Sequence, residues 1–153
     1  MRSDEVRKEL AGLAPAVSAA AEFGEGIYDP AVTAMVYAEM LRRAERALQL
    51  GESVIVDASW TASTPRQDAR RVAHGTSSAL VEIECTVPSD VAAERLRHRT
   101  ETYGSDASPA IAQAMARQMD PWRDAFAIDT DRPVADVLAE ACRLIRGRGS
   151  DGP

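Results

Sequence analysis

Short apolar runs alternate with segments of helical spacing along this chain, and this alternation limits the possible folds more than any other feature. Three runs predict β-strands: SVIVDAS at 53–59, ALVEIEC at 79–85 and AFAIDT at 125–130. The first is continuous and β-branched, as expected of a strand covered on both faces. Strands that alternate with amphipathic helices form βαβ crossovers and hence a parallel sheet. The sequence therefore predicts one α/β unit.

Proline marks the beginnings of the expected helices. A proline in the first turn costs little, because its missing N–H would have no partner within the helix. The first expected helix runs from an N-cap at Asp29 to a stop at Gly51. The second is expected to open with a capping box, TPRQ at 64–67. The expected helices span 30–50, 64–75, 89–101, 108–119 and 133–146. The remaining residues, 147–153, have no apolar anchor and are expected to form a disordered tail behind a domain of residues 1–146.

Charge and composition exclude several classes of function. The formal net charge of −6 disfavours a nucleic-acid partner held by non-specific electrostatics. No apolar run approaches the roughly 20 residues that span a bilayer, and no signal-peptide pattern is present, so no membrane is expected as a partner. Cys85 and Cys142 are expected to be buried free thiols. These features predict a cytoplasmic protein.

The first expected strand ends at a polar residue in a position suited to ligand binding. Ligands of open parallel α/β sheets bind outside the carboxyl ends of the strands, and Asp57 stands there. Its carboxylate could orient a metal-bound water or a substrate hydroxyl; alternatively it caps the following turn. Trp60 either lines the same cleft or packs against the sheet.

Two further charged pairs have both a functional and a structural interpretation. Asp4 and Arg7 form an Asp-x-x-Arg pair of the kind that follows a strand and faces a substrate; alone, Asp4 is a helix N-cap with a charge partner one turn on. Arg95 and Arg99 lie four residues apart on one helical face, which is typical of a solvated basic face. They also suit a phosphate clamp, because guanidinium pairs bidentately with phosphate oxygens.

Taken together, these stretches resemble a known family. The chain is similar to the small P-loop kinases, an AAA family ATPase group that includes gluconate kinase, adenylylsulfate kinase, zeta-toxin and polynucleotide kinase. Within that group it looks most like the kinase-like, ATP-binding portion of actinobacterial proteins that also carry an aminoglycoside-phosphotransferase-like region. The resembling stretches are RSDEVRKEL, FGEGIYDP, GESVIVDASW, ALVEIECTVPSDVAAERLRHR, SDASPAI, DPW and IDT.

The resemblance implies a role for each candidate residue. Asp4 would bind or deprotonate the hydroxyl that receives phosphate, and Arg7 would hold an anionic part of the acceptor or the phosphoryl group. Asp57 would support the acceptor or the magnesium shell. Arg95 and Arg99 match the lid arginines that stabilise charge on the γ-phosphoryl.

The resemblance also implies the ligands. The segment containing Tyr28, together with Trp60, would shape the pocket for a small-molecule hydroxyl acceptor, and ATP and Mg²⁺ would be the cofactors of the intact family. No protein residue is implied as a dedicated metal ligand.

The chain departs from the family at one motif. These kinases begin with a strand, the loop G-x-x-x-x-G-K-[ST], a helix and a second strand that leads into the Asp-x-x-Arg pair. No Gly-x4-Gly-Lys occurs in the 153 residues, and the one lysine, Lys8, follows DEVR. That loop surrounds the β- and γ-phosphates with backbone N–H groups. The chain is therefore expected to be the C-terminal part of an ATP-dependent phosphotransferase domain, inactive alone, and a start codon assigned too far downstream is the simplest cause.

The same departure affects the expected sheet. In the family the strand order is 2-3-1-4-5, so without the P-loop strand and the strand after the first helix the sheet is incomplete. Segments 53–59 and 79–85 would then flank a slot about 9.6 Å wide with apolar edges. Either the two segments close together, or another polypeptide (a partner strand or a second copy) fills the slot, or the chain is poorly stable. Three hypotheses follow: a truncated phosphotransferase, a non-catalytic remnant or interaction module that uses its open edge, and an unrelated α/β domain.

Overall fold

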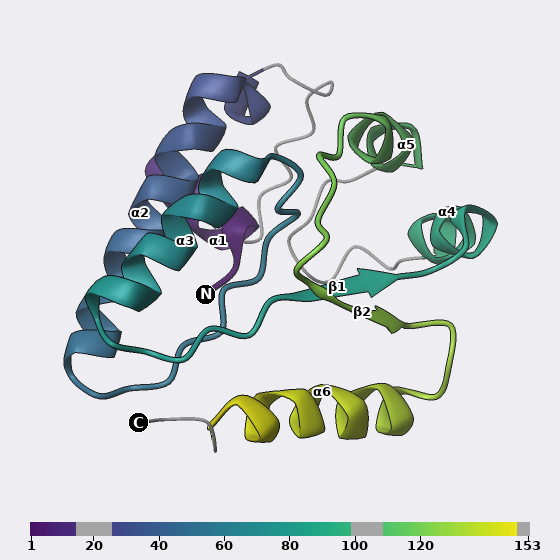
Figure 1. Ribbon diagram of the computed structural model, residues 1–153. Coiled ribbons are helices and arrows are strands. Elements are labelled where there is room, and N and C mark those ends of the chain that lie inside the picture. The colour runs from purple at the N-terminus through teal and green to yellow at the C-terminus, as the bar shows by residue number, and fades with distance from the viewer. Residues whose placement is uncertain (15–25, 99–108, 150–153) are drawn as a thin grey trace.

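The computed structural model describes residues 1–14, 26–98 and 109–149 of the chain. It is an α/β protein in which α1, α2 and α3 gather on one side of a small sheet, α4 and α5 lie on the other, and α6 runs along the bottom of the view in Figure 1. The elements in chain order are α1 (Ser3–Leu10), the 3-10 helix η1 (Gly26–Tyr28), α2 (Pro30–Gln49), α3 (Ser63–Gly75), β1 (Ile83–Thr86), α4 (Ser89–His98), α5 (Pro109–Arg117), β2 (Phe126–Asp129) and α6 (Val134–Gly149).

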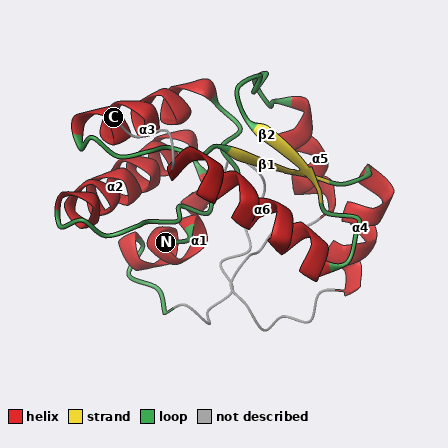
Figure 2. Ribbon diagram, turned by 60° about the horizontal axis from the view of Figure 1, so that its bottom comes forward, coloured by secondary structure: helices red, strands yellow, loops and turns green. Residues whose placement is uncertain are grey.

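Two of the three expected strands are confirmed and pair in parallel. β1 and β2 align from Ile83 opposite Phe126 to Thr86 opposite Asp129. Ile128 of β2 is 1% exposed. Helix α6 crosses the pair and packs on β2 (Figure 2). The result is an open, two-stranded parallel sheet, consistent with an incomplete P-loop type of fold.

The third expected strand, 53–59, is not a strand. Its backbone pairs with the backbone of the N-terminus: the Met1 ammonium donates to Ile55 O at 2.8 Å, Asp57 N donates to Met1 O at 2.8 Å, and Ser3 N donates to Asp57 O at 2.9 Å. The Trp60 indole also donates to Val56 O, at 3.4 Å. A strand requires a ladder, and on the opposite side of 53–59 no described residue supplies one. Among the described residues this segment has not closed onto β1, and Ile55 is 78% exposed.

The ends of the first long helix follow from local chemistry, as expected. Asp29 precedes α2 and its Oδ1 accepts from Ala31 N at 2.7 Å. After the helix, Gly51 has φ +79°, and its N–H donates to Leu48 O at 2.9 Å. Glycine adopts this left-handed conformation without the penalty that a side chain brings.

The start of α3 corrects a prediction. The helix begins at Ser63 and its N-cap, Ala62, makes no side-chain cap, so Thr64 lies inside the helix and the expected capping box is absent. The free N–H of Ser63 instead donates to Asp120 Oδ2 at 2.7 Å. A carboxylate 57 positions away in the sequence therefore caps this helix.

The hydrophobic core lies where α1 meets α2. Val6, Val36 and Met40 form it, each at most 3% exposed. Val32, Val56 and Ala58 pack around them. Burial of side chains of this size contributes roughly 1.5–3 kcal/mol each. The segment 53–59 is thus held by the side chains of one face, Val56 and Ala58, in addition to its backbone bonds to the N-terminus.

Several predictions about exposure can also be compared with the structure. Cys85 is exposed rather than buried, because no described strand covers the β1 edge that it occupies; Cys142 is half-buried, and neither is in a disulfide. His74 and His98 are exposed helix residues. Across the described residues, no helix has the length and apolar character needed to cross a bilayer.

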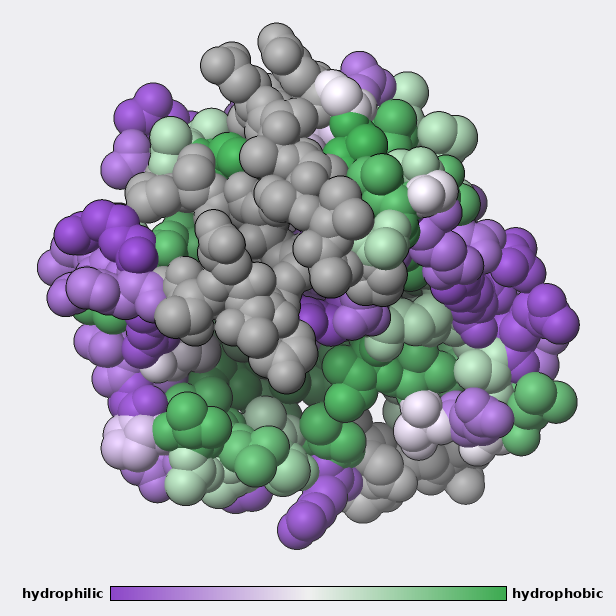
Figure 3. Space-filling view, turned by 180° about the vertical axis from the view of Figure 1, so that it is seen from behind, coloured by the Kyte–Doolittle hydropathy of each residue, from purple (hydrophilic) through white to green (hydrophobic). Residues whose placement is uncertain are grey.

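The last helix is longer than expected and less covered. α6 continues to Gly149, so part of the expected tail is helical, and 150–153 lie outside the described residues. One half of its apolar stripe faces out, with Val134 81%, Leu138 60% and Ile145 49% exposed. On the molecular surface, apolar residues (green) appear in several places among hydrophilic ones (purple), as Figure 3 shows from behind.

Candidate active site

A cavity of about 930 Å³ brings four of the candidate residues together. Its walls come from α1, from η1 and the first turns of α2, from residues 57–62, from the start of α3, and from α5 and the residue that follows it. Asp4, Arg7, Tyr28 and Asp57 all line it. Residues that are distant in the sequence therefore share one concave site large enough for a small-molecule ligand.

Asp4 stands in the first turn of α1, directly after the backbone pairing with 55–57. The N-cap of this helix is Arg2, so the interpretation of Asp4 as an N-cap is wrong. Its position still places the carboxylate in the favourable field of the helix N-terminus. Within the described residues, the Asp4 carboxylate has no hydrogen-bond or ion-pair partner. It remains available to a ligand in the cavity.

Arg7 lies one turn further along α1 and is only 6% exposed. Its Nη1 donates to Ile27 O at 2.7 Å and to Thr33 Oγ1 at 3.1 Å, and the guanidinium stands 4.9 Å from the centroid of the Tyr28 ring. These contacts fix η1 and the start of α2 against α1. The Nε atom is buried and has no partner in the described chain.

Asp57 joins the same wall from the other side. Its carboxylate is 64% exposed and accepts from Arg2 Nε at 3.4 Å. The parallel bridge between Arg2 and Asp57 sets the side chains of α1 beside the end of the 53–59 segment. Asp57 therefore lines the cavity, at the end of a segment that is not the expected strand.

Trp60 packs beside the cavity rather than lining it. Its φ is +49°, an uncommon conformation for a bulky side chain. Tyr37, which does line the cavity, holds it: Tyr37 Oη accepts from Trp60 N at 2.9 Å and contacts Ser59 Oγ at 3.2 Å, and the two rings lie 5.1 Å apart. The turn after Asp57 is thus fixed by a strained residue and its aromatic neighbour.

The expected lid arginines are not brought to the cavity by the described residues. Arg95 bonds at the end of β2, donating to Thr130 O at 2.9 Å and to Asp131 Oδ1 at 3.4 Å, and it does not line the cavity. Arg99 lies outside the described residues. The turn itself is closed by Asp129, whose Oδ1 accepts from Asp131 N at 2.8 Å.

The sequence reasoning missed how the α5 wall is attached. Ile111, Met115 and Gln118 line the cavity, and the chain after them is anchored through the DPW stretch. The Ser63 N–H bond holds the pKa of the Asp120 carboxyl below its usual value. The DPW stretch (residues 120–122) is the sequence signal for this attachment, but its residue types alone do not indicate a role.

A buried arginine completes the attachment. Arg66 is 3% exposed and stacks 4.9 Å from the centroid of the Trp122 ring. It donates to Ala62 O at 3.1 Å, to Asp120 O at 3.1 Å and to Pro121 O at 3.4 Å. The DPW stretch is therefore held against α3.

Glu82 connects this cluster to the sheet. Trp122 Nε1 donates to Glu82 Oε2 at 3.0 Å, and Arg70 pairs with Glu82 through two bonds of 2.7 Å. The Arg70 bonds are the largest cause of the lowered pKa of Glu82. α3, the DPW stretch and the chain entering β1 are thus joined by one polar network.

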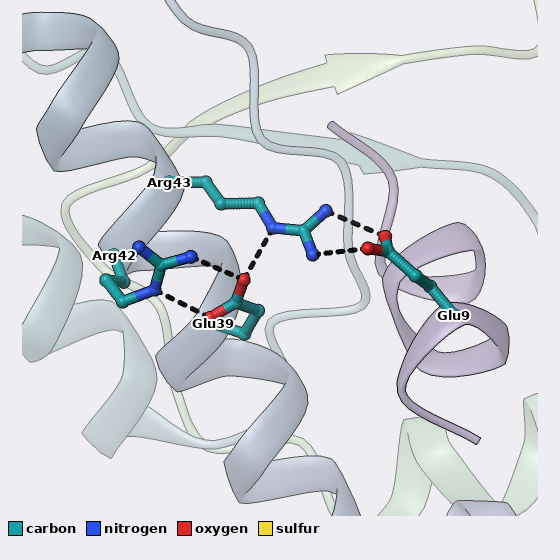
Figure 4. A network of polar contacts seen from close by, with 4 residues as sticks. All are labelled: Glu9, Glu39, Arg42 and Arg43. Carbon is teal, nitrogen blue, oxygen red and sulfur yellow. Dashed lines mark hydrogen bonds and ion pairs between the residues drawn. The ribbon is translucent and has the colours of Figure 1, made fainter. Parts of the chain in front are cut away.

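A second polar network fixes α1 on α2 (Figure 4). Arg43 pairs bidentately with Glu9 at 2.8 and 2.9 Å and donates to Glu39 at 2.7 Å. Hydrogen bonds from Arg42 and then Arg43 lower the pKa of Glu39 from 4.5 to about 2. The helix that carries Asp4 and Arg7 is thereby tied to the longest helix of the molecule.

Comparison with known proteins identifies the family of the chain. Residues 1–122 match the family model AAA_33, described as an AAA domain. Uncharacterized protein Rv2004c of Mycobacterium tuberculosis and uncharacterized protein Mb2027c of Mycobacterium bovis are each 35% identical to the chain over 144 residues, 94% of its length. The match covers 29% of each relative, so the chain spans less than a third of their length. On the extent of the family match, the chain belongs to the AAA_33 family of AAA domains, a P-loop kinase-like family.

Proposed function

We propose that this chain forms the acceptor-binding part of an ATP-dependent phosphotransferase that acts on a hydroxyl group of a small molecule. The observation that carries the proposal is the single cavity lined by Asp4, Arg7 and Asp57. These residues arrive from two segments more than fifty positions apart, at the place where the family resemblance puts the acceptor.

Asp4 has the features required to accept the proton of the reacting hydroxyl. Its carboxylate lines the cavity and has no partner among the described residues. A carboxylate in this position would orient the hydroxyl and take its proton as phosphate is transferred. Asp57, across the Arg2 bridge, would hold a second polar group of the same acceptor.

Arg7 would contribute positive charge that is fixed before the substrate arrives. Its Nη1 bonds to Ile27 O and Thr33 Oγ1 hold the guanidinium one turn from Asp4 on the same helix. Fixed charge of this kind stabilises the transferring phosphoryl without reorganisation. The buried Nε–H still lacks an acceptor in the described chain, and an oxygen of the acceptor or phosphoryl group would supply one.

The residues of this chain do not provide a binding site for the phosphates of the nucleotide. No Gly-x4-Gly-Lys occurs in the 153 residues, and the described part of the chain has no group of carboxylates, histidines or cysteines suited to a metal ion. We therefore assign the phosphate cradle to residues outside this sequence. The 153 residues alone are expected not to transfer phosphate from ATP.

The unpaired backbone favours a second candidate, a non-catalytic interaction module. Segment 53–59 is bonded on one side only, β1 pairs only with β2 among the described strands, and Ile55 and Cys85 are exposed. An extended segment of another polypeptide, or of a second copy, would pair with such edges. In that case the cavity residues would be dispensable for binding.

One experiment separates the two candidates. A longer form with a Gly-x4-Gly-Lys-Ser loop ahead of residue 1 is assayed for acceptor-dependent ADP formation, with Asp4→Asn as the test and Asp90→Asn on the exposed surface of α4 as the control. We expect Asp4→Asn to lower turnover by at least about 100-fold, as for loss of a general base, with ATP affinity within about twofold. Unchanged turnover in Asp4→Asn would remove it from the acceptor role, and no acceptor-dependent turnover in any longer form favours the interaction module.

A further inference from the structure

The walls of the cavity differ in polarity. Every described lining residue of the N-terminal wall is polar: Arg2, Ser3, Asp4 and Arg7. On α2, in contrast, small apolar residues spaced four apart face the cavity: Pro30, Ala34 and Ala38. Ile111 and Met115 on α5 have the same spacing and line it as well. The cavity therefore has a polar end and an apolar end.

The two ends belong to different parts of the molecule. α1 packs on α2, whereas α5 packs on α4 on the other side of the sheet (Figure 1). The cavity of about 930 Å³ lies near the upper end of the roughly 300–1,000 Å³ typical of sites for drug-sized molecules. It is therefore large enough for a ligand with two chemically different ends.

The polar end contains a buried donor that needs an acceptor. Arg7 lines the cavity, is 6% exposed, and has a buried Nε without a partner in the described chain. A buried donor left unpaired is costly, and a carboxylate would pair with the guanidinium through charge-assisted hydrogen bonds. A phosphate dianion would meet stronger repulsion from Asp4 and Asp57, which line the same cavity. A singly charged carboxylate is thus the anionic group that suits this end.

The apolar end disfavours a polyhydroxylated body. Hydroxyl groups placed against Ala34, Ala38 or Met115 would lose water without gaining a hydrogen bond from these side chains. Thr33 lies on the same side of α2, but its Oγ1 already accepts from Arg7 Nη1 at 3.1 Å. A hydrocarbon group in this position would instead be removed from water, which favours binding.

We propose that the ligand of this cavity is an amphipathic hydroxy acid, with a hydroxyl and a carboxylate at one end and a hydrocarbon body at the other. The carboxylate binds at Arg7, the hydroxyl lies at Asp4, and the body packs between α2 and Met115 of α5. Met115 is then a residue that determines specificity. The inference rests on the proposed function only for its assignment of this ligand as the phosphate acceptor.

The first test uses hydroxy acids that share one head group and differ in the body. Lactate, leucic acid and phenyllactate carry a methyl, an isobutyl and a benzyl group, whereas gluconate carries a chain of hydroxyls. Binding to the full 153-residue chain is measured by ligand-observed NMR at low salt without nucleotide. Each buried methylene should tighten binding about fourfold. We therefore expect leucic acid and phenyllactate to bind at least about tenfold tighter than lactate, and gluconate no tighter than lactate.

The neutral amide of phenyllactate tests the carboxylate. Phenyllactamide keeps the hydroxyl and the benzyl group but has no negative charge, so it should bind at least about tenfold more weakly than phenyllactate. Equal binding of the acid and the amide overturns the inference. Equal affinity of lactate and phenyllactate, tighter binding of gluconate, or no binding of any of these acids also overturns it.

A matched pair of methionine variants locates the hydrocarbon body. Met115→Gln keeps the length of the side chain but makes the α5 wall polar, so phenyllactate should bind at least about fivefold more weakly, with lactate changed less than about twofold. Met35→Gln is the control, because Met35 is 58% exposed on α2 and does not line the cavity. Circular dichroism checks that both variants fold. Unchanged phenyllactate binding in Met115→Gln would contradict the placement of the body on α5.

Failure of this inference is distinguishable from failure of the proposed function. Transfer to gluconate but not to phenyllactate by the longer form would refute the amphipathic ligand and leave the phosphotransferase intact. Selective binding of phenyllactate without any transfer would refute the phosphotransferase and leave the ligand class of the cavity in place. The two measurements are independent, because the binding assay contains no ATP.

Discussion

The part of the chain up to Gly75 and the part after it differ sharply in how well they are packed. In the first part, Val6, Val36, Tyr37, Met40, Leu41, Ala44 and Ala73 are buried, together with Arg7, Lys8 and Arg66. In the second part, Ile128 alone among the described residues reaches that degree of burial. The first part thus holds a core of its own, whereas the second is a two-stranded sheet with helices around it.

The difference shows which side of the cavity is rigid. The wall with Asp4, Arg7 and Asp57 belongs to the packed part, where α1 is fixed on α2 by core side chains and by the Glu9–Arg43 pair. The wall formed by α5 belongs to the sparse part and depends on the DPW attachment. The residues proposed for chemistry are therefore better supported than those that enclose the ligand.

The largest expected effect tests the packing contrast itself. Met40→Ala removes a side chain that is 0% exposed, and we expect a loss of about 2–5 kcal/mol in the free energy of unfolding. Ile128→Ala is the matched change in the sparse part, where few buried neighbours surround the side chain, and it should cost at least 1 kcal/mol less. Urea unfolding of both variants measures the two losses in free energy of unfolding. Equal losses would contradict the difference in packing between the two parts of the chain.

The next effect concerns the attachment of α5. Arg66→Met keeps most of the side-chain volume but removes the donors to three backbone carbonyls and the stacked charge on Trp122. Charge-assisted hydrogen bonds contribute about 1.5–3 kcal/mol, so a loss of that size is expected, with faster hydrogen exchange in 111–118. Arg97→Met on the exposed face of α4 is the control. Unchanged exchange in α5 would show that Arg66 does not hold this wall.

A smaller effect is expected at the turn after Asp57. Tyr37→Phe keeps the ring against Trp60 and removes the hydroxyl that accepts from Trp60 N. Loss of one such bond should cost about 1 kcal/mol, and the strained Trp60 turn should exchange its amide faster. A variant as stable as the parent, with an unchanged Trp60 amide, would mean that the aromatic contact alone fixes the turn.

The smallest effect is a pH dependence in the packed part. The pKa of Glu39 is about 2 in the folded chain against 4.5, because Arg42 and Arg43 donate to its carboxylate. Folding is thus stabilised while Glu39 is ionised, fully above about pH 4.5, and this contribution disappears as the pH falls toward 2. In Glu39→Gln, the loss of stability between pH 5 and 2.5 should be shallower than in the parent. If the free energy of unfolding, measured in urea, fell equally with pH in the variant and the parent, Glu39 would make no such contribution to stability.

Local signals were predictable from the sequence, and signals that depend on a distant partner were not. The Asp29 cap and the Gly51 stop were predicted because each acts within three residues. The Asp120 cap of α3 was not, because its carboxylate reaches Ser63 only after the chain has folded. A strand at 53–59 was predicted from its β-branched residues, but a ladder also requires a neighbour, and none is supplied beyond Met1–Ser3 by the described residues.

The residues of the candidate site also differ in whether the sequence could predict them. Asp4, Arg7, Tyr28 and Asp57 were proposed from motif and family resemblance, and they share the cavity. The residues of α5 and Asp68 were missed, because apolar residues and a lone aspartate on a helix have no spacing that distinguishes a cavity wall from a core or a solvated face. Arg95 was proposed from its spacing to Arg99 and from the family's lid arginines, but in the structure it bonds to the turn after β2.

The anchoring of Asp120 has a consequence for the stability of the cavity wall. The chain leaves the sheet at Thr86 and is secured again at Asp120, and α4 is also attached to the residues after β2 through Arg95. Loss of the Asp120 carboxylate would therefore loosen the α5 wall, while the α1–α2 core and the carboxylate of Asp4 would stay in place.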